Sequence, residues 1–166
     1  QRHVRGKRSQ RGGFGAQETF SPSSISNYDH EFWYPAVQAA GQQAYRMAGV
    51  RDDDVDALMC YDNFSPTVLF SLEGLGFCPR GESGRFVEGG TLKLGNRLPL
   101  NTDGGHLSNS YMQGWALNVE AVRQLMGDGG KRQVKNTANA LVTGIGGIPY
   151  GRNWGTSTVM ILTPDA

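Results

Sequence analysis

The sequence predicts an α/β fold in which helices pack on a β-sheet whose last two strands form an antiparallel pair. Two segments, 35–49 and 109–127, place apolar residues at helical spacing. A short apolar run that ends at Tyr61 is typical of a buried strand. Two β-rich runs, 137–146 and 155–164, close the chain. The resulting order of helices and strands indicates a layered α/β domain.

The N-terminal part, residues 1–30, is predicted to be a basic, Gly/Ser-rich loop or linker, and residues 31–166 form the predicted domain. The first eleven residues carry five of the 16 Lys and Arg residues and no acid, although the net charge of the chain is only +1. A solvated segment accounts for this charge, and a basic arm that binds nucleic acid is the alternative. We favour the solvated segment and expect no nucleic-acid partner. The glycine- and serine-rich residues that follow lack periodicity, which indicates a loop.

The first helix is expected to begin at Pro35 and to end at Gly49, because proline is favoured in the first turn and glycine just after the last. An acidic turn, "RDDD", separates it from the strand that ends at Tyr61. A second helix follows, with Ser65 as its N-cap and Pro66 at its first position.

The segment 78–100 is rich in turn residues and predicts little regular structure. The helix over 109–127 is the strongest in the chain, and Gly127 ends it. Its apolar residues are spaced along one face: Trp115, Val119, Val122 and Met126. The glycine-rich "GIPYGRNW" between the two final β-rich runs suits a hairpin connection.

Composition narrows the class of protein further. A chain of 166 residues is predicted to form one domain. No apolar run reaches the roughly 18 residues of a membrane helix, and the N-terminus has no signal-peptide core, so we expect a cytoplasmic protein without a membrane partner. Cys60 and Cys78 are predicted to be small buried hydrophobic residues rather than metal ligands or a disulfide.

Three short motifs occur in a fixed order. "YDNF" (61–64) directly follows the first strand, "NTDGGHLSNSYMQG" (101–114) leads into the long helix, and "GIGG" (144–147) lies between the last two strands. The second motif is a long polar loop with no charge after Asp103. A loop of this kind indicates that it lines a site.

In this order the motifs resemble the C-terminal half of the thiolase superfamily, from about residue 30 to residue 166. Thiolases carry N-E-A-F or H-D-C-F, then N-x-x-G-G-x-x-x-x-G-H-P-x-G, then C-x-G-G-G in that half. The resemblance implies a thiolase-like half-domain with helices layered on a mixed five-stranded sheet. It also implies a pseudo-symmetric N-terminal half, in the same or another chain.

The departures from the thiolase pattern concern its reactive residues. The register aligns the invariant positions of the second motif with Asn101, Gly104, Gly105 and Gly114. Tyr111 then stands at the thiolase histidine, Tyr61 at the Asn or His of the first motif, and Gly144 at the acid/base cysteine. The nucleophilic cysteine of the family belongs to the N-terminal half, which this chain does not contain.

These replacements change the chemistry that the resemblance implies. Claisen condensation or thiolysis needs a thiolate and a His/Cys pair that moves protons. Backbone N–H groups of glycine turns can still form an oxyanion hole for a thioester, and Gly105, Gly146 and Gly147 are the candidates. Proton-transfer groups beside such a hole suit aldol chemistry without a covalent intermediate.

The two tyrosines make the chain similar to the thiolase-like aldolases, of lipid-transfer-protein type, in bacterial steroid side-chain degradation. This resemblance implies a carbon–carbon lyase that cleaves a 3-hydroxyacyl-CoA, in that family steroid-derived, by retro-aldol chemistry. Tyr61 and Tyr111 are then the catalytic base and acid, in an order that the sequence leaves open. An acetyl-CoA acetyltransferase-like enzyme and a catalytically degenerate acyl-CoA- or lipid-binding homologue are the alternatives.

A tyrosine base needs stabilisation, because a phenol has a pKa near 10 and burial raises it further. Asn63 and His106 are the candidate supporting donors, and Arg152 is a further one. The alternative for His106 is a loop-stabilising hydrogen bonder.

The resemblance also implies partners. Coenzyme A enters as part of the acyl-CoA substrate, and neither a covalent cofactor nor a metal is expected. The full proteins of the family dimerise, so a homodimer is expected, and a small OB-fold, zinc-ribbon protein is a further expected partner. A lone C-terminal half exposes the apolar face meant for its N-terminal half, so we expect that this chain alone is inactive and is not a free monomer.

Overall fold

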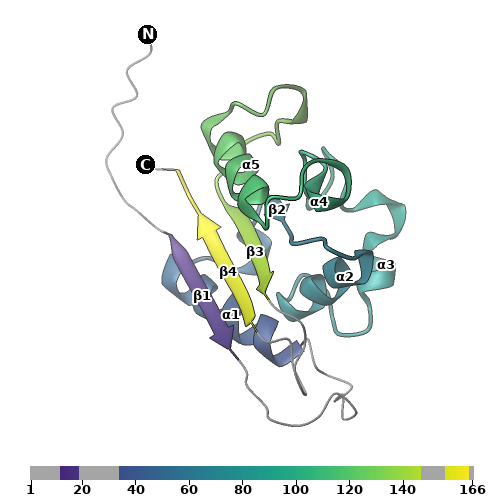
Figure 1. The fold of residues 1–166 in the computed structure, drawn as a ribbon, viewed down its shortest axis with the longest axis vertical. Helices are drawn as coiled ribbons and strands as arrows, with labels where there is room; N and C mark the ends of the chain where they lie inside the picture. The colour runs from purple at the N-terminus through teal and green to yellow at the C-terminus, as the bar shows by residue number, and fades with distance from the viewer. Residues whose placement is uncertain (1–11, 19–33, 147–155, 165–166) are drawn as a thin grey trace.

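One mixed β-sheet organises the computed structural model, which describes residues 12–18, 34–146 and 156–164 (Figure 1). The strands are β1 (Gly13–Glu18), β2 (Ala57–Met59), β3 (Ala140–Gly146) and β4 (Thr156–Leu162). They lie in the order β1-β4-β3-β2. β3 pairs in parallel with β2 and antiparallel with β4, which pairs antiparallel with β1. The predicted α/β class and the predicted C-terminal antiparallel pair are confirmed.

Helices cover both faces of this sheet (Figure 1). They are α1 (Tyr34–Ala48), α2 (Ser65–Gly74), α3 (Ser83–Val87), α4 (Gly105–Ser108) and α5 (Trp115–Met126), with short 3-10 turns at Asp52–Asp54, Glu88–Gly90 and Gly130–Arg132. α1 packs on β1 and β4 and against α2, whereas α5 packs on the opposite face, over β2 and β3. The predicted first helix is confirmed, and Gly49 ends it with φ 68°. No helix in the described residues is long and apolar enough to cross a membrane.

The central strands divide their side chains between two apolar cores, as the two-residue period of a strand requires. Leu58 and Leu141 belong to the core under α1 and α2. Met59 and Val142 belong to the core under α5. The same alternation continues past the end of β2, so that Cys60 lies in the first core and Tyr61 in the second.

The sheet has four strands in the described residues rather than the predicted five. Beside β2, a single parallel bridge between Leu58 and Leu100 takes the place of a further strand. The Leu58 N–H donates to the Pro99 carbonyl oxygen and the Asn101 N–H donates to the Leu58 carbonyl oxygen, each at 2.9 Å. The pairing extends no further because Pro99 has no N–H and Asn101 leaves the extended conformation, with φ 43°.

The expected N-terminal loop is wrong for residues 13–18, which form β1 and pair with β4 along their whole length. Glycine is depleted in strands, so this segment carries no strand signal. Its glycines serve a close approach of α1: a Cβ added to Gly15 would lie 2.7 Å from the carbonyl carbon of Ala40, and one added to Gly13 2.9 Å from that of Ala44. Residues 1–11 and 19–30 of the expected loop lie outside the described residues, and the division at residue 30 stays a prediction.

The start of α2 differs by one residue from the prediction. Phe64, rather than Ser65, is the N-cap residue, and its side chain makes no capping bond. Asn63 supplies the local polar contact instead, because its Oδ1 accepts hydrogen bonds from the Thr67 hydroxyl at 2.9 Å and from the Phe64 N–H at 3.1 Å. Pro66 lies in the first turn, at the second helical position rather than the predicted first.

The helix α5 is shorter than predicted and its predicted apolar face is exposed. Residues 109–114 form a loop, and the short helix α4 precedes them. Leu117 and Ala121 of α5 are buried against the sheet. Four apolar residues point away from it and are exposed: Trp115, Val119, Val122 and Met126. The helix is therefore apolar on two faces, and only one of them meets the sheet of this chain.

The contact between β1 and α1 provides a test of the fold. Gly15→Ala is expected to lower the free energy of unfolding by about 1–3 kcal/mol, the usual cost of overpacking, because the new methyl group meets the backbone of α1. Gly12→Ala is the matched control, since the nearest atom to its added Cβ is the Ile161 carbonyl oxygen at 3.6 Å. Urea unfolding followed by circular dichroism measures both. Equal stability of the two variants would contradict this packing of α1 on β1.

Candidate active site

A buried asparagine joins the two segments that form the site. The Cys60 N–H donates to Asn101 Oδ1 at 2.7 Å, and Asn101 Nδ2 donates to the Cys60 carbonyl oxygen at 2.8 Å. The side-chain amide thus pairs with the backbone of Cys60 as a neighbouring strand would. It extends the bridge between Leu58 and Leu100 by one step. As a result, the loop that begins at Asn101 runs alongside the segment that follows β2.

The same loop is tied to α5 by a buried polar network. The Thr102 hydroxyl donates to Glu120 Oε1 at 2.8 Å, and Gln124 Nε2 donates to the Thr102 hydroxyl at 2.9 Å. Arg132 forms an ion pair with Glu120 at 3.1 Å. Burial by itself raises the pKa of Glu120, but hydrogen bonds from Arg132, Thr102 and Gln124 outweigh it and lower the pKa. Glu120 is therefore an anion held by partners on both sides of the loop.

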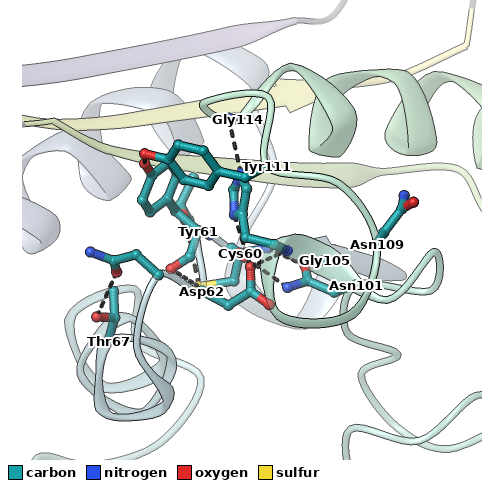
Figure 2. A network of polar contacts seen from close by, with 12 residues as sticks. Cys60, Tyr61, Asp62, Thr67, Asn101, Gly105, Asn109, Tyr111 and Gly114 are labelled. Carbon is teal, nitrogen blue, oxygen red and sulfur yellow. Dashed lines mark hydrogen bonds and ion pairs between the residues drawn. The ribbon is translucent and has the colours of Figure 1, made fainter.

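Tyr61 and Tyr111 meet in the space between these segments (Figure 2). Their hydroxyl oxygens are 3.0 Å apart, although the residues are 50 positions apart in the chain. Tyr61 is 9% exposed, and its N–H donates to the Thr143 hydroxyl on β3 at 2.9 Å. Tyr111, in the loop before α5, is 61% exposed. The structure thus brings together the two tyrosines that the sequence singled out, one buried and one open to solvent.

The environment of Tyr61 favours its protonated form. Burial raises the pKa of Tyr61 to about 12, and the hydrogen bond with Tyr111 and the negative charge of Asp62 act in the same direction. Tyr61 therefore keeps its proton at neutral pH. This differs from the expectation that neighbouring donors stabilise a phenolate at this position.

The His106 imidazole lies beside the rings of both phenols. Its Nδ1 is 2.9 Å from Asp62 Oδ1, which also accepts the His106 backbone N–H at 2.9 Å. Its Nε2 accepts the Gly114 N–H at 3.0 Å. The imidazole is 4.5 Å from the Tyr61 ring and 5.3 Å from the Tyr111 ring, between centroids. His106 thus acts as the loop-stabilising hydrogen bonder of the alternative interpretation, and its nitrogens bond to Asp62 and Gly114 rather than to a phenol oxygen.

The other predicted supporting residues lie elsewhere. Asn63 is exposed and its side-chain oxygen bonds to Thr67 on α2, so it does not support the phenols. Arg152 lies outside the described residues. Sequence reasoning did not select Asp62 for this site; its place next to Tyr61 in "YDNF" is the only signal that could have done so.

The structure describes two of the three predicted oxyanion donors, Gly105 and Gly146. The Gly105 N–H already donates to Asp103 Oδ1 at 3.0 Å, so it is not free to contact a thioester oxygen. Gly146 lies in β3, paired with Thr156 of β4. Gly147 lies outside the described residues. An N–H group of the "GIGG" turn therefore remains a prediction, whereas Gly105 as a donor is wrong for this conformation.

At the position of the missing thiolase cysteine, a side chain would meet the hydroxyl group of Thr158. A Cβ added to Gly144 would collide with the hydroxyl oxygen of Thr158, which donates to the Gly144 carbonyl oxygen at 3.1 Å. The two cysteines of the chain, Cys60 and Cys78, are free and buried, as predicted, and burial raises the pKa of each thiol to about 11. Neither offers a thiolate nucleophile. In the described residues, no group of three or more His, Cys, Asp or Glu side chains is placed to hold a metal ion.

Comparison with known proteins identifies the family of the chain. The sequence profile of the thiolase C-terminal domain-like family matches residues 18–163. The chain is 43% identical over 115 residues to the steroid side-chain-cleaving aldolase of Thermomonospora curvata, which covers 69% of this chain and 29% of that protein. It is 38% identical over 115 residues to the 17-hydroxy-3-oxo-4-pregnene-20-carboxyl-CoA lyase of Mycobacterium tuberculosis. This match covers 69% of this chain and 30% of that protein. The chain thus spans less than a third of the length of these relatives.

A solved structure described as Ltp2-ChsH2(DUF35) aldolase has a similar fold. It superposes with a TM-score of 0.74 at 35% sequence identity, over 90% of this chain and 38% of the other. The similarity therefore covers nearly all of this chain and the smaller part of the other.

The amide of Asn101 provides a test of how the site is assembled. Asn101→Ala is expected to lower the free energy of unfolding by about 2–4 kcal/mol, because it leaves both backbone groups of Cys60 buried without a partner, at about 1–3 kcal/mol each. Asn109→Ala is the matched control, since Asn109 is exposed and its side-chain amide bonds to Asp103, at 2.9 Å. Asn101→Gly should be nearly as destabilising as Asn101→Ala, because it relieves the positive φ without restoring the amide. If urea unfolding gave both variants the stability of Asn109→Ala, the pairing with Cys60 would not hold the segments together.

Proposed function

Because the chain belongs to the thiolase C-terminal domain-like family, we propose that it is the C-terminal part of an acyl-CoA aldolase. This carbon–carbon lyase cleaves a 3-hydroxyacyl-CoA by retro-aldol chemistry. The observation that carries the proposal is the 3.0 Å contact between the hydroxyls of Tyr61 and Tyr111. The two phenols stand where the thiolase register has its Asn or His and its catalytic His.

The reaction needs only proton transfer and stabilisation of an enolate. A base removes the proton of the 3-hydroxyl group, the bond between Cα and Cβ breaks, and the former hydroxyl carbon leaves as an aldehyde or ketone. The electron pair of the broken bond passes to the thioester as an enolate, which an acid then protonates at Cα. Donors near the thioester oxygen stabilise the enolate in the transition state.

The surroundings of the tyrosines suggest how they divide these roles. Tyr111 is open to solvent and is the phenol that a substrate can reach. Tyr61, whose pKa is raised to about 12, keeps its proton and can donate a hydrogen bond to the Tyr111 oxygen. Such a bond stabilises the anionic oxygen that Tyr111 needs in order to take up the substrate proton. The contact between the two hydroxyls also gives a path by which a proton reaches the enolate.

A thiolase-type acyl transfer is less well supported. It requires a thiolate and a proton-transferring cysteine, whereas Gly144 has no side chain and both cysteines of this chain are buried. A degenerate binding protein would not need the two hydroxyls to meet. The steroid nature of the acyl group, and coenzyme A as part of the substrate, are proposed from the names of the two curated relatives.

The exposed face of α5 supports an N-terminal thiolase half as a partner, in the same or another chain. This face carries Trp115, which is 69% exposed, and continues from Tyr111 and Met112 beside the site. A contiguous apolar surface of this kind is typical of an interface. We propose that the N-terminal half covers it and completes the site. The homodimer and a small OB-fold, zinc-ribbon protein remain further proposals; the joint name Ltp2-ChsH2(DUF35) supports a second component.

Removal of either hydroxyl tests the proposed reaction. Tyr61→Phe and Tyr111→Phe are each expected to lower the turnover of a 3-hydroxyacyl-CoA by at least about 100-fold, the usual contribution of general acid–base catalysis, and to leave acyl-CoA binding nearly intact. Tyr34→Phe is the control, because the Tyr34 hydroxyl accepts a bond from Gln38 on α1, away from the site. Release of aldehyde or ketone is measured with the complete enzyme, in the absence and presence of free coenzyme A.

A retro-aldol reaction proceeds without free coenzyme A. Cleavage that depends on added coenzyme A would instead indicate thiolysis. Binding of acyl-CoA without any cleavage, in a preparation that contains both halves, would indicate a degenerate binding protein.

The exposed face of α5 makes a separate prediction. In sedimentation experiments, this chain expressed by itself is expected to self-associate, because the apolar face has no partner. The double variant Val119→Lys and Val122→Lys is expected to shift it toward the monomer. Asp128→Lys is the control, since it adds a lysine just beyond the helix. A monomeric wild-type chain, or equal association of both variants, would show that this face needs no partner.

A further inference from the structure

The buried pair of Asp62 and His106 carries an inference beyond the two tyrosines. The side chain of His106 is 2% exposed and that of Asp62 is 7% exposed. Asp62 directly follows Tyr61, whereas His106 belongs to α4 and Gly114 ends the loop that carries Tyr111. The pair therefore connects the segment of one phenol to the loop of the other (Figure 2).

The hydrogen bonds define the state of the imidazole. Gly114 has an N–H that can only donate, so Nε2 of His106 must be an unprotonated acceptor. Nδ1 then carries the proton and donates to Asp62 Oδ1. The imidazole ring therefore has one orientation, in which its acceptor nitrogen faces the Gly114 N–H and its donor nitrogen faces the Asp62 carboxylate.

The position of Gly114 affects the position of the Tyr111 hydroxyl, because both residues belong to the same loop. Gly114 has φ 91° and is the N-cap residue of α5, so a bond to its N–H fixes the point at which the loop enters the helix. Gln113 next to it also has positive φ, at 47°, which an unanchored loop would avoid. Tyr111 is 61% exposed; its hydroxyl is 3.0 Å from the Tyr61 hydroxyl, and its ring lies 5.3 Å from the His106 ring. Its hydroxyl thus depends on the anchored loop for its place.

We propose that Asp62 and His106 are positioning residues, which hold the Gly114 N–H and thereby place the Tyr111 hydroxyl against Tyr61. Asp62 sets the orientation and tautomer of the imidazole, and the imidazole anchors the loop. Neither residue touches the reacting atoms. The effect on turnover rests on the proposed aldolase function, whereas the hydrogen bonds do not.

Two substitutions separate the two bonds of His106. In His106→Gln the side-chain amide reaches the place of Nε2 and can still accept the Gly114 N–H. In His106→Asn the amide reaches the place of Nδ1 and can bond to Asp62, but nothing accepts from Gly114. We expect His106→Asn to lower kcat by about 100-fold, the cost of misplacing a catalytic group by about 1 Å, with KM changing much less. His106→Gln should recover at least a tenth of the wild-type kcat. Equal losses in both variants, or a loss confined to KM, would overturn the proposal.

Two measurements test the anchor without any assay of activity. ¹⁵N NMR of histidine-labelled enzyme should show the Nδ1–H tautomer for the histidine whose signal is absent in His106→Gln. Hydrogen exchange at the Gly114 amide should be slow in the wild type and in His106→Gln and fast in His106→Asn. An Nε2–H tautomer, or fast exchange in the wild type, would overturn the proposal. An enzyme that shows the expected tautomer and exchange but cleaves no 3-hydroxyacyl-CoA would refute the proposed function and leave the anchor in place.

Discussion

The assembly of the site depends on the hydrogen bonds between the side chain of Asn101 and the backbone of Cys60. Two backbone groups in the core need partners, because a buried polar group without one costs about 1–3 kcal/mol. A regular fifth strand would have supplied them, but the pairing beside β2 ends at Leu100. The amide of Asn101 takes over as donor and acceptor at the step where the strand stops. The chain can therefore leave the sheet at Asn101, and the buried backbone groups of Cys60 still have hydrogen-bond partners.

Because the Asn101 side chain takes the place of a pairing strand, the residues after Asn101 are free to form the loop of the site. The loop is held at both ends. At its start, Thr102 bonds to Glu120 and Gln124 of α5. At its end, Gly114 bonds to His106, which is itself oriented by Asp62. Between these anchors, residues 107–113 are exposed, and that combination gives an accessible phenol a defined position.

The site combines a thiolase framework with different proton-transfer groups. The position of the acid/base cysteine is a glycine, Gly144, and the Thr158 hydroxyl lies where its side chain would begin. Two phenols in hydrogen-bond contact stand at the remaining reactive positions. Tyr61 is a weak nucleophile because burial keeps it protonated at neutral pH, and phenol hydroxyls can donate and accept hydrogen bonds. The framework is therefore suited to a reaction in which protons move and no acyl group is transferred to the protein.

The sequence by itself determined most of the secondary structure, the C-terminal antiparallel pair and the two tyrosines. Apolar periodicity and Gly or Pro at helix ends are local signals, and the motif register needs only the order of residues.

The features that depend on contacts between distant segments come from the tertiary structure. β1 is a strand because α1 packs directly on its glycines, and the outer face of α5 is apolar without being buried. Asn63 and Gly105 bond to their own neighbours, whereas Asp62 and His106, 44 positions apart, bond to each other. The choice of hydrogen-bond partner and the closeness of two backbones are properties of packed segments, and no pattern along one segment records them.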